Sequence, residues 1–379
     1  MAHDVIIVGA GPAGSTAARV LAESSKHVVI IDKAKFPRDK LCAGGVTSKV
    51  IPLLPPGFND IIISSVHKTI IHYSNTDLRV GIESIEPCTY MVERAAFDMY
   101  LLDAAITSGV KFIEGKRVIG FWQDSKGVEV YTDPPDTFKA NYLIAADGAM
   151  SRIHSQTFSQ RQPYNAYCLE AKIPWSNQND EVIFNFGSTP TGYAWIFPKG
   201  DYASIGLGVR SKNISNIFEY YKRFFDMHGI KWVKPKGLSL PMYSMETRLT
   251  HKRVLFAGDA AHLVDPITGE GIYHAILSGS MAAKAIISGG NTGTTYQTMM
   301  NKTILKELRR AFFLSLIMYH FPRLSFEALR LHPSIGKTYL GVITGENTYK
   351  DLLKTSTHSP YKILKHIIKC LQADQLSVR

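Results

Sequence analysis

Cysteine is scarce in this 379-residue chain, which contains four: Cys42, Cys88, Cys168 and Cys370. They form neither a Cys-x-x-Cys pair nor the dense framework of a small disulfide-linked secreted domain. Their pattern therefore predicts a reducing, cytoplasmic setting.

Long apolar runs are also missing. No stretch approaches ~18 consecutive apolar residues, so the sequence predicts no membrane-spanning helix. The apolar run that begins at Val5 is short and follows His3 and Asp4, which is not the pattern of a signal peptide. We find no internal repeat, no low-complexity tract and no residue spacing typical of a metal site. With 45% hydrophobic and 20% charged residues, the composition is that of an ordinary globular protein with two or three structural units.

The strongest motif lies near the N-terminus, where Gly9, Gly11 and Gly14 follow the pattern G-x-G-x-x-G. The apolar run before it predicts a buried parallel strand, and residues 15–22 after it predict a helix. Gly9 allows the tight turn, Gly11 lets a pyrophosphate approach the backbone, and Gly14 lets helix and strand pack closely. The helix N-terminus offers free N–H groups and partial positive charge to that pyrophosphate.

A second apolar strand, Val28–Ile31, ends in Asp32, whose carboxylate can accept hydrogen bonds from a ribose. Strand, fingerprint, helix, strand and acid in this order predict a dinucleotide site. The alternative is a tight turn between strand and helix that holds no ligand.

Two later segments distinguish FAD from NAD. Residues 142–152 form an apolar strand that runs into the turn Asp147-Gly148, and residues 253–271 contain Gly258-Asp259, Pro266 and Gly269-Glu270-Gly271. Together they resemble the second and third fingerprints of FAD enzymes with the p-hydroxybenzoate-hydroxylase fold. That resemblance implies that Asp259 binds the ribityl chain and that the helix opened by Gly271 stabilises negative charge on the reduced flavin.

Three further stretches resemble the geranylgeranyl reductase family, flavoenzymes that saturate isoprenoid double bonds. The first is Pro37-x-x-Lys40-x-Cys42-x-Gly44-Gly45, and the second is Tyr193-x-Trp195-x-Phe197-Pro198. The third is Pro266-x-Thr268-Gly269-Glu270-Gly271-Ile272. Ala43 and His262 stand where many relatives have glycine. The match covers residues 1 to about 350 in order, which a chance match would not give.

The resemblance implies a set of site residues. Cys42 and Tyr193 are the candidate catalytic residues, and the candidate substrate slot is lined by Tyr193, Trp195, Phe197 and Pro198. The candidate FAD-binding residues are Gly9, Gly11, Ala13, Gly14, Asp32, Lys33, Cys42, Ala43, Gly44, Gly45, Arg94, Val118, Asp147, Gly148, Gly258, Asp259, Gly269, Gly271 and Ile272.

Each assignment has a plainer alternative. Cys42 has the alternative of being a small buried residue that fits its loop, although an active-site loop rarely needs a thiol for packing alone. Strand alternation puts Tyr193, Trp195 and Phe197 on one face, which serves an ordinary core as well as an apolar slot. Arg94, at the start of a predicted helix, could be a simple surface charge, although the helix dipole disfavours that.

The expected fold is α/β: an FAD-binding Rossmann-like domain, an inserted antiparallel-sheet substrate domain and a C-terminal helical subdomain. The FAD-binding domain would comprise residues 1–59, 87–160 and 241–290. The substrate domain would comprise residues 60–86 and 161–240, and the helical subdomain residues 291–379.

The expected function is FAD-dependent hydrogenation of carbon–carbon double bonds in a polyprenyl chain, carried by a lipid, a quinone or a diphosphate. No second dinucleotide fingerprint is visible, so electrons would come from NAD(P)H or a ferredoxin-like protein that visits transiently. Two alternatives stay open. One is a flavin monooxygenase or halogenase acting on a small aromatic substrate, and the other is a membrane-associated flavin-binding regulator without catalysis.

Positive charge is concentrated near the C-terminus. The formal net charge is +11, and residues 302–379 carry thirteen Lys and Arg against five Asp and Glu, a net of +8. No nucleic-acid recognition motif accompanies them. Residues Lys362–Leu371 have helical period, with lysines opposite isoleucines and leucines. That segment either caps the core or rests on an anionic membrane surface, which would place the protein at the inner face of a membrane.

Overall fold

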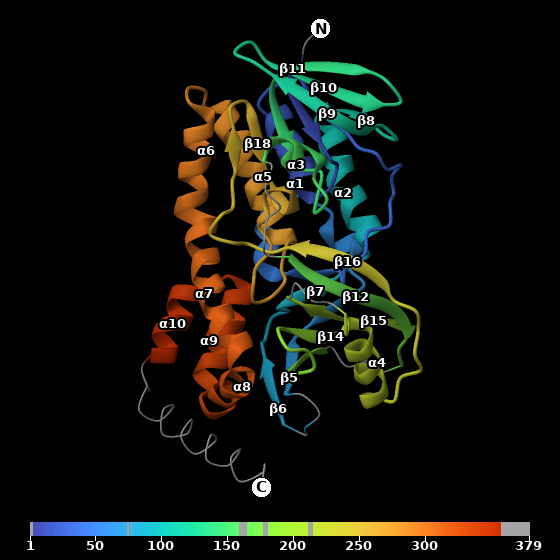
Figure 1. The fold of residues 1–379 in the computed structure, drawn as a ribbon, viewed down its shortest axis with the longest axis vertical. Helices are drawn as coiled ribbons and strands as arrows, with labels where there is room; N and C mark the ends of the chain where they lie inside the picture. Colours follow the sequence, from blue (N-terminus) through green and yellow to red (C-terminus); the bar gives the residue numbers. More distant parts are fainter. Residues whose placement is uncertain are drawn as a thin grey trace.

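The structure is a computed structural model and describes residues 3–73, 76, 78–158, 165–176, 181–210 and 215–357. It has two lobes stacked along the long axis, with a column of helices along one side (Figure 1). The basic segment Lys362–Leu371 lies outside the described residues.

The upper lobe contains an eight-stranded sheet whose core is parallel. Its main order is β17 (Thr250–His251), β18 (Val254–Phe256), β11 (Thr137–Ala145), β1 (His3–Val8), β2 (Val28–Ile31) and β8 (Lys111–Ile113). β9 (Arg117–Gln123) and β10 (Val128–Asp133) extend from β11 as an antiparallel meander. The apolar runs predicted as buried strands are β1 and β2, which pair in parallel.

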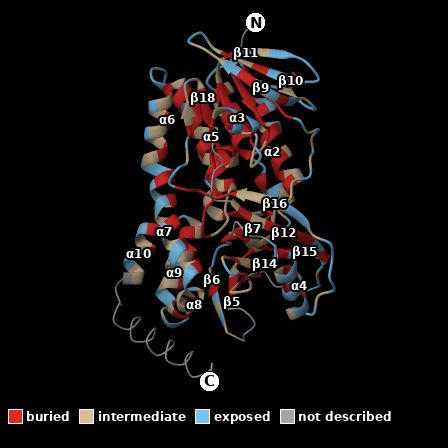
Figure 2. Cartoon of the chain, viewed as in Figure 1, coloured by how far each residue is buried: buried red, intermediate tan, exposed pale blue. Residues whose placement is uncertain are grey.

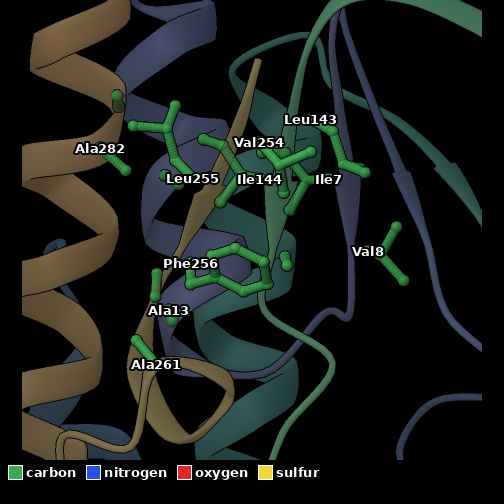
Figure 3. Packing of buried hydrophobic residues seen from close by; sticks show 14 of the residues in the cluster. Ile7, Val8, Ala13, Leu143, Ile144, Val254, Leu255, Phe256, Ala261 and Ala282 are labelled. Carbon is green, nitrogen blue, oxygen red and sulfur yellow. The ribbon is translucent and has the colours of Figure 1, made fainter. Parts of the chain in front are cut away.

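Helices cover this sheet and bury its faces. They are α1 (Pro12–Ala22), α2 (Arg94–Thr107), α3 (Arg152–Thr157) and α5 (Ile272–Ile287). Ile7, Ile144 and Leu255 occupy matching register positions on three neighbouring strands and lie side by side in the core (Figure 3). Helices α1 and α5 can approach closely because Gly279 of α5 has no side chain. A Cβ at this position would lie 2.1 Å from the Ala13 carbonyl oxygen of α1.

The lower lobe contains a seven-stranded sheet. Its order is β16 (Lys236–Pro241), β12 (Asn165–Pro174), β15 (Tyr202–Val209), β14 (Gly192–Lys199), β13 (Glu181–Phe186), β5 (Lys68–Tyr73) and β6 (Arg79–Glu83). The sheet is mixed rather than purely antiparallel, since β5 and β13 run in parallel. Helix α4 (Ile217–Met227) covers the face formed by Ile205, Leu207 and their neighbours. The opposite face turns toward the upper lobe.

A small sheet joins the lobes. Strands β3 (Gly45–Thr47), β7 (Thr89–Met91) and β4 (Ser64–Val66) pair antiparallel. Residues 60–86, which the sequence assigns to the substrate domain, therefore divide: β4 joins this small sheet, while β5 and β6 enter the large one. The sheet carries the Cys42 loop between the two lobes.

The C-terminal part is helical, as expected. It comprises α6 (Thr292–Met300), α7 (Lys306–His320), α8 (Pro322–Leu331), α9 (Pro333–Thr344) and α10 (Tyr349–Thr357). Their inner faces are buried and their outer faces exposed, whereas the central strands β1, β2 and β18 of the upper sheet are buried almost throughout (Figure 2). Among the described residues, no helix is both long and apolar enough to cross a membrane.

Candidate active site

A cavity of about 950 Å³ lies between the two large sheets. It is lined by all the candidate site residues except Gly14, Gly258 and Pro198. Segments separated by more than two hundred residues thus meet around one space. The roles of the individual residues follow from the surroundings of each.

The glycine fingerprint occupies one end of the cavity. Gly9 has φ +102°, and a Cβ there would lie 2.3 Å from the Ala146 carbonyl oxygen. A Cβ on Gly14 would lie 1.9 Å from the carbonyl oxygen of Gly9, so Gly14 is needed for packing. Gly11 differs, because its Cβ would meet only the Arg38 guanidinium, at 3.4 Å. Gly9 therefore serves the turn, Gly14 serves the packing of helix on strand, and Gly11 is open toward the cavity.

Helix α1 begins at Pro12 with Gly11 as its N-cap, and no side chain caps it. Its first N–H groups are available to a phosphate, as the sequence predicts. Asp32 holds this end together: its carboxylate accepts hydrogen bonds from the N–H of Ala10 at 2.7 Å and of Ala34 at 2.8 Å. These bonds fix the carboxylate at the cavity wall, where a ribose would meet it.

Arg94 opens α2 and is buried, which excludes the surface-charge alternative. Its guanidinium donates to both carboxylate oxygens of Asp98, at 2.8 and 2.9 Å, and Arg38 pairs with the same carboxylate at 2.8 Å. Burial alone would lower the pKa of Arg94, but Asp98 and Cys42 outweigh it and raise that pKa. Two guanidinium groups that share one carboxylate therefore face the cavity beside the fingerprint, and the cluster keeps a net positive charge.

The Cys42 loop approaches the cavity as predicted. The Cys42 sulfur accepts a hydrogen bond from the Gly44 N–H at 3.4 Å. Gly44 has φ +75°, and a Cβ there would lie 2.2 Å from the Val92 carbonyl oxygen and 2.5 Å from Lys199 Nζ. Lys199 is buried under the loop, and that burial lowers its pKa. The loop can take this path only with glycine at position 44.

The third fingerprint closes the cavity on the α5 side. Asp259 pairs with Lys40 at 3.2 Å. Burial opposes ionisation of Asp259, but Lys40 and Arg94 outweigh it and lower the carboxyl pKa. Gly271 is the N-cap of α5 and lines the cavity with Ile272. A 16-residue helix therefore points its positive end at the space where a flavin ring would lie.

Asp147 has a structural task as well. Its carboxylate accepts hydrogen bonds from the hydroxyl of Ser151 and from the N–H groups of Arg152 and Ile153, at the start of α3. Gly148, which follows it, has φ +81° and open space around its Cα. The two residues form part of the cavity wall.

The aromatic strand faces the cavity with one side, as alternation predicts. Tyr193, Trp195 and Phe197 line the cavity, whereas Ala194 and Ile196 point into the core under α4. The Tyr193 hydroxyl donates to the carbonyl of Thr268, which ties β14 to the third fingerprint. Burial raises the pKa of the Tyr193 phenol well above its ordinary value.

Several lining residues carry no sequence motif. Phe184 on β13 contacts Tyr193 and Phe197, with ring centroids 5.4 and 5.3 Å apart, and extends the aromatic wall. Tyr319 of α7 and Tyr339 of α9 line the same cavity, so the C-terminal helices help to enclose it. Strand alternation could have indicated Phe184; nothing local could have indicated the two tyrosines.

The sequence did not lead us to predict Glu170 and Cys168 as site residues. They alternate on β12 with Leu169 and Ala171, which pack under α4, so both face the cavity. A buried acid on the inner face of a strand was the available signal. Among the described residues, no group of His, Cys, Asp and Glu has the arrangement of a metal site.

His262 does not line the cavity. It has φ +53° and stacks on His154 with ring centroids 4.8 Å apart. Glycine adopts this backbone conformation most easily, which explains why a glycine suits the position in the related sequences. Burial and His154 lower the pKa of His262 to about 4.

Comparison of the sequence with known protein families shows which family has this set of motifs. The sequence matches the FAD binding domain family over residues 2–173 and the geranylgeranyl reductase catalytic domain family over residues 166–238. It is 30% identical over 319 residues to a menaquinone reductase of Mycolicibacterium smegmatis, covering 76% of this chain and 77% of that one. It is also 30% identical over 310 residues to a digeranylgeranylglycerophospholipid reductase of Methanocaldococcus jannaschii, covering 75% and 78%. The chain belongs to the geranylgeranyl reductase family.

Solved structures support the fold of this family. A geranylgeranyl bacteriochlorophyll reductase-like protein of Thermoplasma acidophilum has a TM-score of 0.80 at 21% identity, covering 97% of this chain and 99% of that one. A flavin-dependent brominase has a TM-score of 0.70 at 19% identity, covering 91% and 94%. At these identities both show the fold alone. The expected α/β flavoprotein fold with a helical C-terminal part is confirmed.

The cofactor of this geranylgeranyl reductase family member is FAD. The residues present fit it: the open Cα of Gly11, the uncapped start of α1 and the net positive cluster of Arg38, Arg94 and Asp98 suit a pyrophosphate. The start of α5 suits a flavin ring that gains negative charge on reduction.

Proposed function

We propose that this family member hydrogenates carbon–carbon double bonds of a polyprenyl chain, carried by a lipid, a quinone or a diphosphate. The observation that carries the proposal is one cavity that joins the dinucleotide fingerprint, the Cys42 loop and the aromatic face of β14. The named relatives, which reduce menaquinone or digeranylgeranylglycerophospholipid, support this substrate class.

The cavity wall suits a prenyl chain. Trp195, Phe197 and Phe184 form an aromatic surface, and Ile82 and Val182 continue it with aliphatic side chains. Such a wall excludes water and binds methyl-branched hydrocarbon without hydrogen bonds. An isolated alkene has no carbonyl to polarise, so the barrier must fall through positioning and water exclusion.

Bound FAD supplies hydride to one alkene carbon. The protein must hold that bond in place and supply a proton to the other carbon. The side chains from the sequence prediction are Cys42, which touches the reacting space from its loop, and Tyr193, whose hydroxyl lies at the Thr268 carbonyl. We propose both as residues that contact the reacting bond. Electrons would reach the flavin from NAD(P)H or a ferredoxin-like donor.

We also propose that the protein takes its substrate from an anionic membrane surface. Helix α7 exposes the large apolar side chains of Phe313, Leu316 and Ile317, and Phe321, directly after the helix, is exposed as well. The same helix begins among Lys302, Lys306, Arg309 and Arg310. Apolar and basic residues together suit an anionic lipid surface.

Anaerobic mixing of reduced enzyme with candidate oxidants tests the enzymatic proposal. Geranylgeranyl diphosphate, a menaquinone and a geranylgeranylated glycerophospholipid are offered separately, and flavin absorbance is followed. Reoxidation by a prenyl compound supports the reductase. A stable oxygen adduct, formed only with air, would instead favour the monooxygenase or halogenase, and indifference to all would leave a flavin-binding regulator.

A further inference from the structure

We propose that Glu170 is the acid that supplies the proton for alkene reduction, an inference that rests on the function proposed above. The carboxyl group lies on β12, lines the cavity and is 2% exposed. No sequence motif includes it.

Register places Glu170 next to the aromatic wall. Gly206 of β15 pairs with Glu170 on one side and with Trp195 on the other. A Cβ on Gly206 would lie 2.4 Å from the Trp195 indole, so the indole lies across that glycine and close to the carboxyl group. The neighbouring strands β12, β15 and β14 thus place Glu170, Gly206 and Trp195 in a row on the same face of the sheet.

One carboxylate oxygen accepts a hydrogen bond, and the other is buried without a partner among the described residues. Ser204 donates to Glu170 Oε1 at 2.7 Å, and Trp195 Nε1 donates to the Ser204 hydroxyl oxygen at 3.3 Å. No described residue hydrogen-bonds the buried Oε2. A buried oxygen without a partner is costly unless it carries a proton and has a group to donate it to.

The surroundings favour the protonated form of Glu170 more than water would. Burial raises the pKa of the carboxyl group, and this outweighs the opposing hydrogen bond from Ser204 and the nearby lysines. The titratable groups that face it are Glu93, Cys168, Lys172, Lys199 and Tyr221. A neutral carboxylic acid in an apolar cavity can act as a proton donor.

A carboxylic acid is by type a stronger acid than a thiol or a phenol; burial raises the pKa of Glu170 and reduces this difference, but it raises the pKa of Tyr193 as well. Ordinary pKa values are about 4.3 for Glu, 8.5 for Cys and 10 for Tyr. An alkene is a very weak base, so transfer from the stronger acid meets the lower barrier. The Tyr193 hydroxyl is also engaged with the Thr268 carbonyl. Glu170 therefore suits the step better than Cys42 or Tyr193.

The step balances. The alkene gains two electrons and two hydrogens: one carbon receives hydride, which reduced FAD supplies as it is oxidised by two electrons. The adjacent carbon receives the proton as the Glu170 O–H bond breaks and a C–H bond forms. The carboxylate left behind takes up a proton from solvent before the next turnover.

Glu170→Gln tests the proposal, because glutamine keeps the shape and the hydrogen bond from Ser204 but has no acidic proton. We expect FAD content to be unchanged and single-turnover reoxidation by geranylgeranyl diphosphate or a menaquinone to slow by about 100-fold. Wild-type rates should fall at alkaline pH as the carboxyl group ionises, and Glu170→Gln should lose that fall. Ser204→Ala should move the fall to higher pH, since the lost hydrogen bond favours the ionised form.

Infrared spectroscopy tests the protonation of Glu170 without any catalytic turnover. Infrared spectra of the FAD-loaded wild type at neutral pH should contain a protonated carboxyl band that Glu170→Gln lacks. Glu129→Gln, a partly exposed acid on β10 paired with Lys139, should keep the band and wild-type rates.

If the wild type turns over and Glu170→Gln reacts at the same rate, the Glu170 proposal is wrong while the proposed function stands. The same conclusion follows if the wild type lacks the protonated carboxyl band. A hundredfold loss in Cys42→Ala with little loss in Glu170→Gln would assign the donor to Cys42 instead. If the wild type is reoxidised by no prenyl compound, the proposed function falls and takes this inference with it.

Discussion

At the scale of single residues, the fingerprint glycines have different tasks. Gly14 has no room for a side chain, whereas Gly11 has room that the pyrophosphate would fill. Gly11 also has an ordinary backbone conformation, with φ −77°. Its exchange should therefore separate cofactor binding from folding.

We expect Gly11→Ala to fold with a near wild-type melting temperature as apoprotein but to bind FAD at least tenfold more weakly. Gly14→Ala is the matched contrast, since its Cβ would lie 1.9 Å from the Gly9 carbonyl oxygen and should prevent correct folding. Circular dichroism and FAD fluorescence titration measure both. Unweakened FAD binding by Gly11→Ala would contradict the assignment of this end to the pyrophosphate.

At the scale of elements, the short helical turn Gly258–Ala261 ends in the left-handed His262, stacked on His154. The pKa of His262 is lowered to about 4 by burial first and by His154 second, so the ring is neutral in the folded protein. In the unfolded chain it takes up a proton near pH 6.5. Stability from this group is therefore complete above that pH and is lost as pH falls toward 4.

We expect the free energy of unfolding of the apoprotein to fall by about 2 kcal/mol between pH 6.5 and 5, from this ring. His262→Asn should flatten that decline, because asparagine tolerates the left-handed conformation and does not titrate. Urea denaturation at several pH values measures it. An equally steep decline in the variant would show that the stack does not control acid stability.

Local patterns were sufficient for some elements and insufficient for others. The turn at Gly9, the strand before it and the aromatic face of β14 follow from period and spacing within a few residues. Strand alternation indicates which face Glu170 and Phe184 share with their neighbours, but it does not show that these faces meet at one cavity. That depends on long-range pairing, such as that of β13 with β5, which is set by tertiary packing and leaves no local mark.

For the C-terminal helices, too, the local pattern predicts burial of one face but not the position of each helix. Their apolar pattern predicts packing against the core, and α7 does pack there. That Tyr319 and Tyr339 also line the cavity depends on how α7 and α9 are placed, which helical period does not specify. The Lys362–Leu371 prediction falls on residues that the structure does not describe and stays a prediction.

At the scale of the whole molecule, the proposed membrane contact joins the exposed side of α7 to the basic C-terminal region. Each basic residue near an anionic leaflet contributes about 1 kcal/mol, and buried apolar side chains add to it. We expect the protein to co-sediment with anionic liposomes at low salt and to be released by high salt.

Two variants should weaken this association. One carries Phe313→Glu and Ile317→Glu, and the other carries Lys362→Glu, Lys365→Glu and Lys369→Glu. Trp122→Glu is the control, because Trp122 is 51% exposed on β9 in the other lobe, and its exchange should change nothing. Wild-type protein that ignores anionic liposomes at low salt would show that substrate arrives by another route.

The most direct measurement of the central claim is the mass of the prenyl substrate after reaction with the reduced holoenzyme under anaerobic conditions. Hydrogenation predicts products heavier by two hydrogens for each double bond removed, with one flavin reoxidised per bond. Flavin that is reoxidised while every tested prenyl chain keeps its mass would contradict the account.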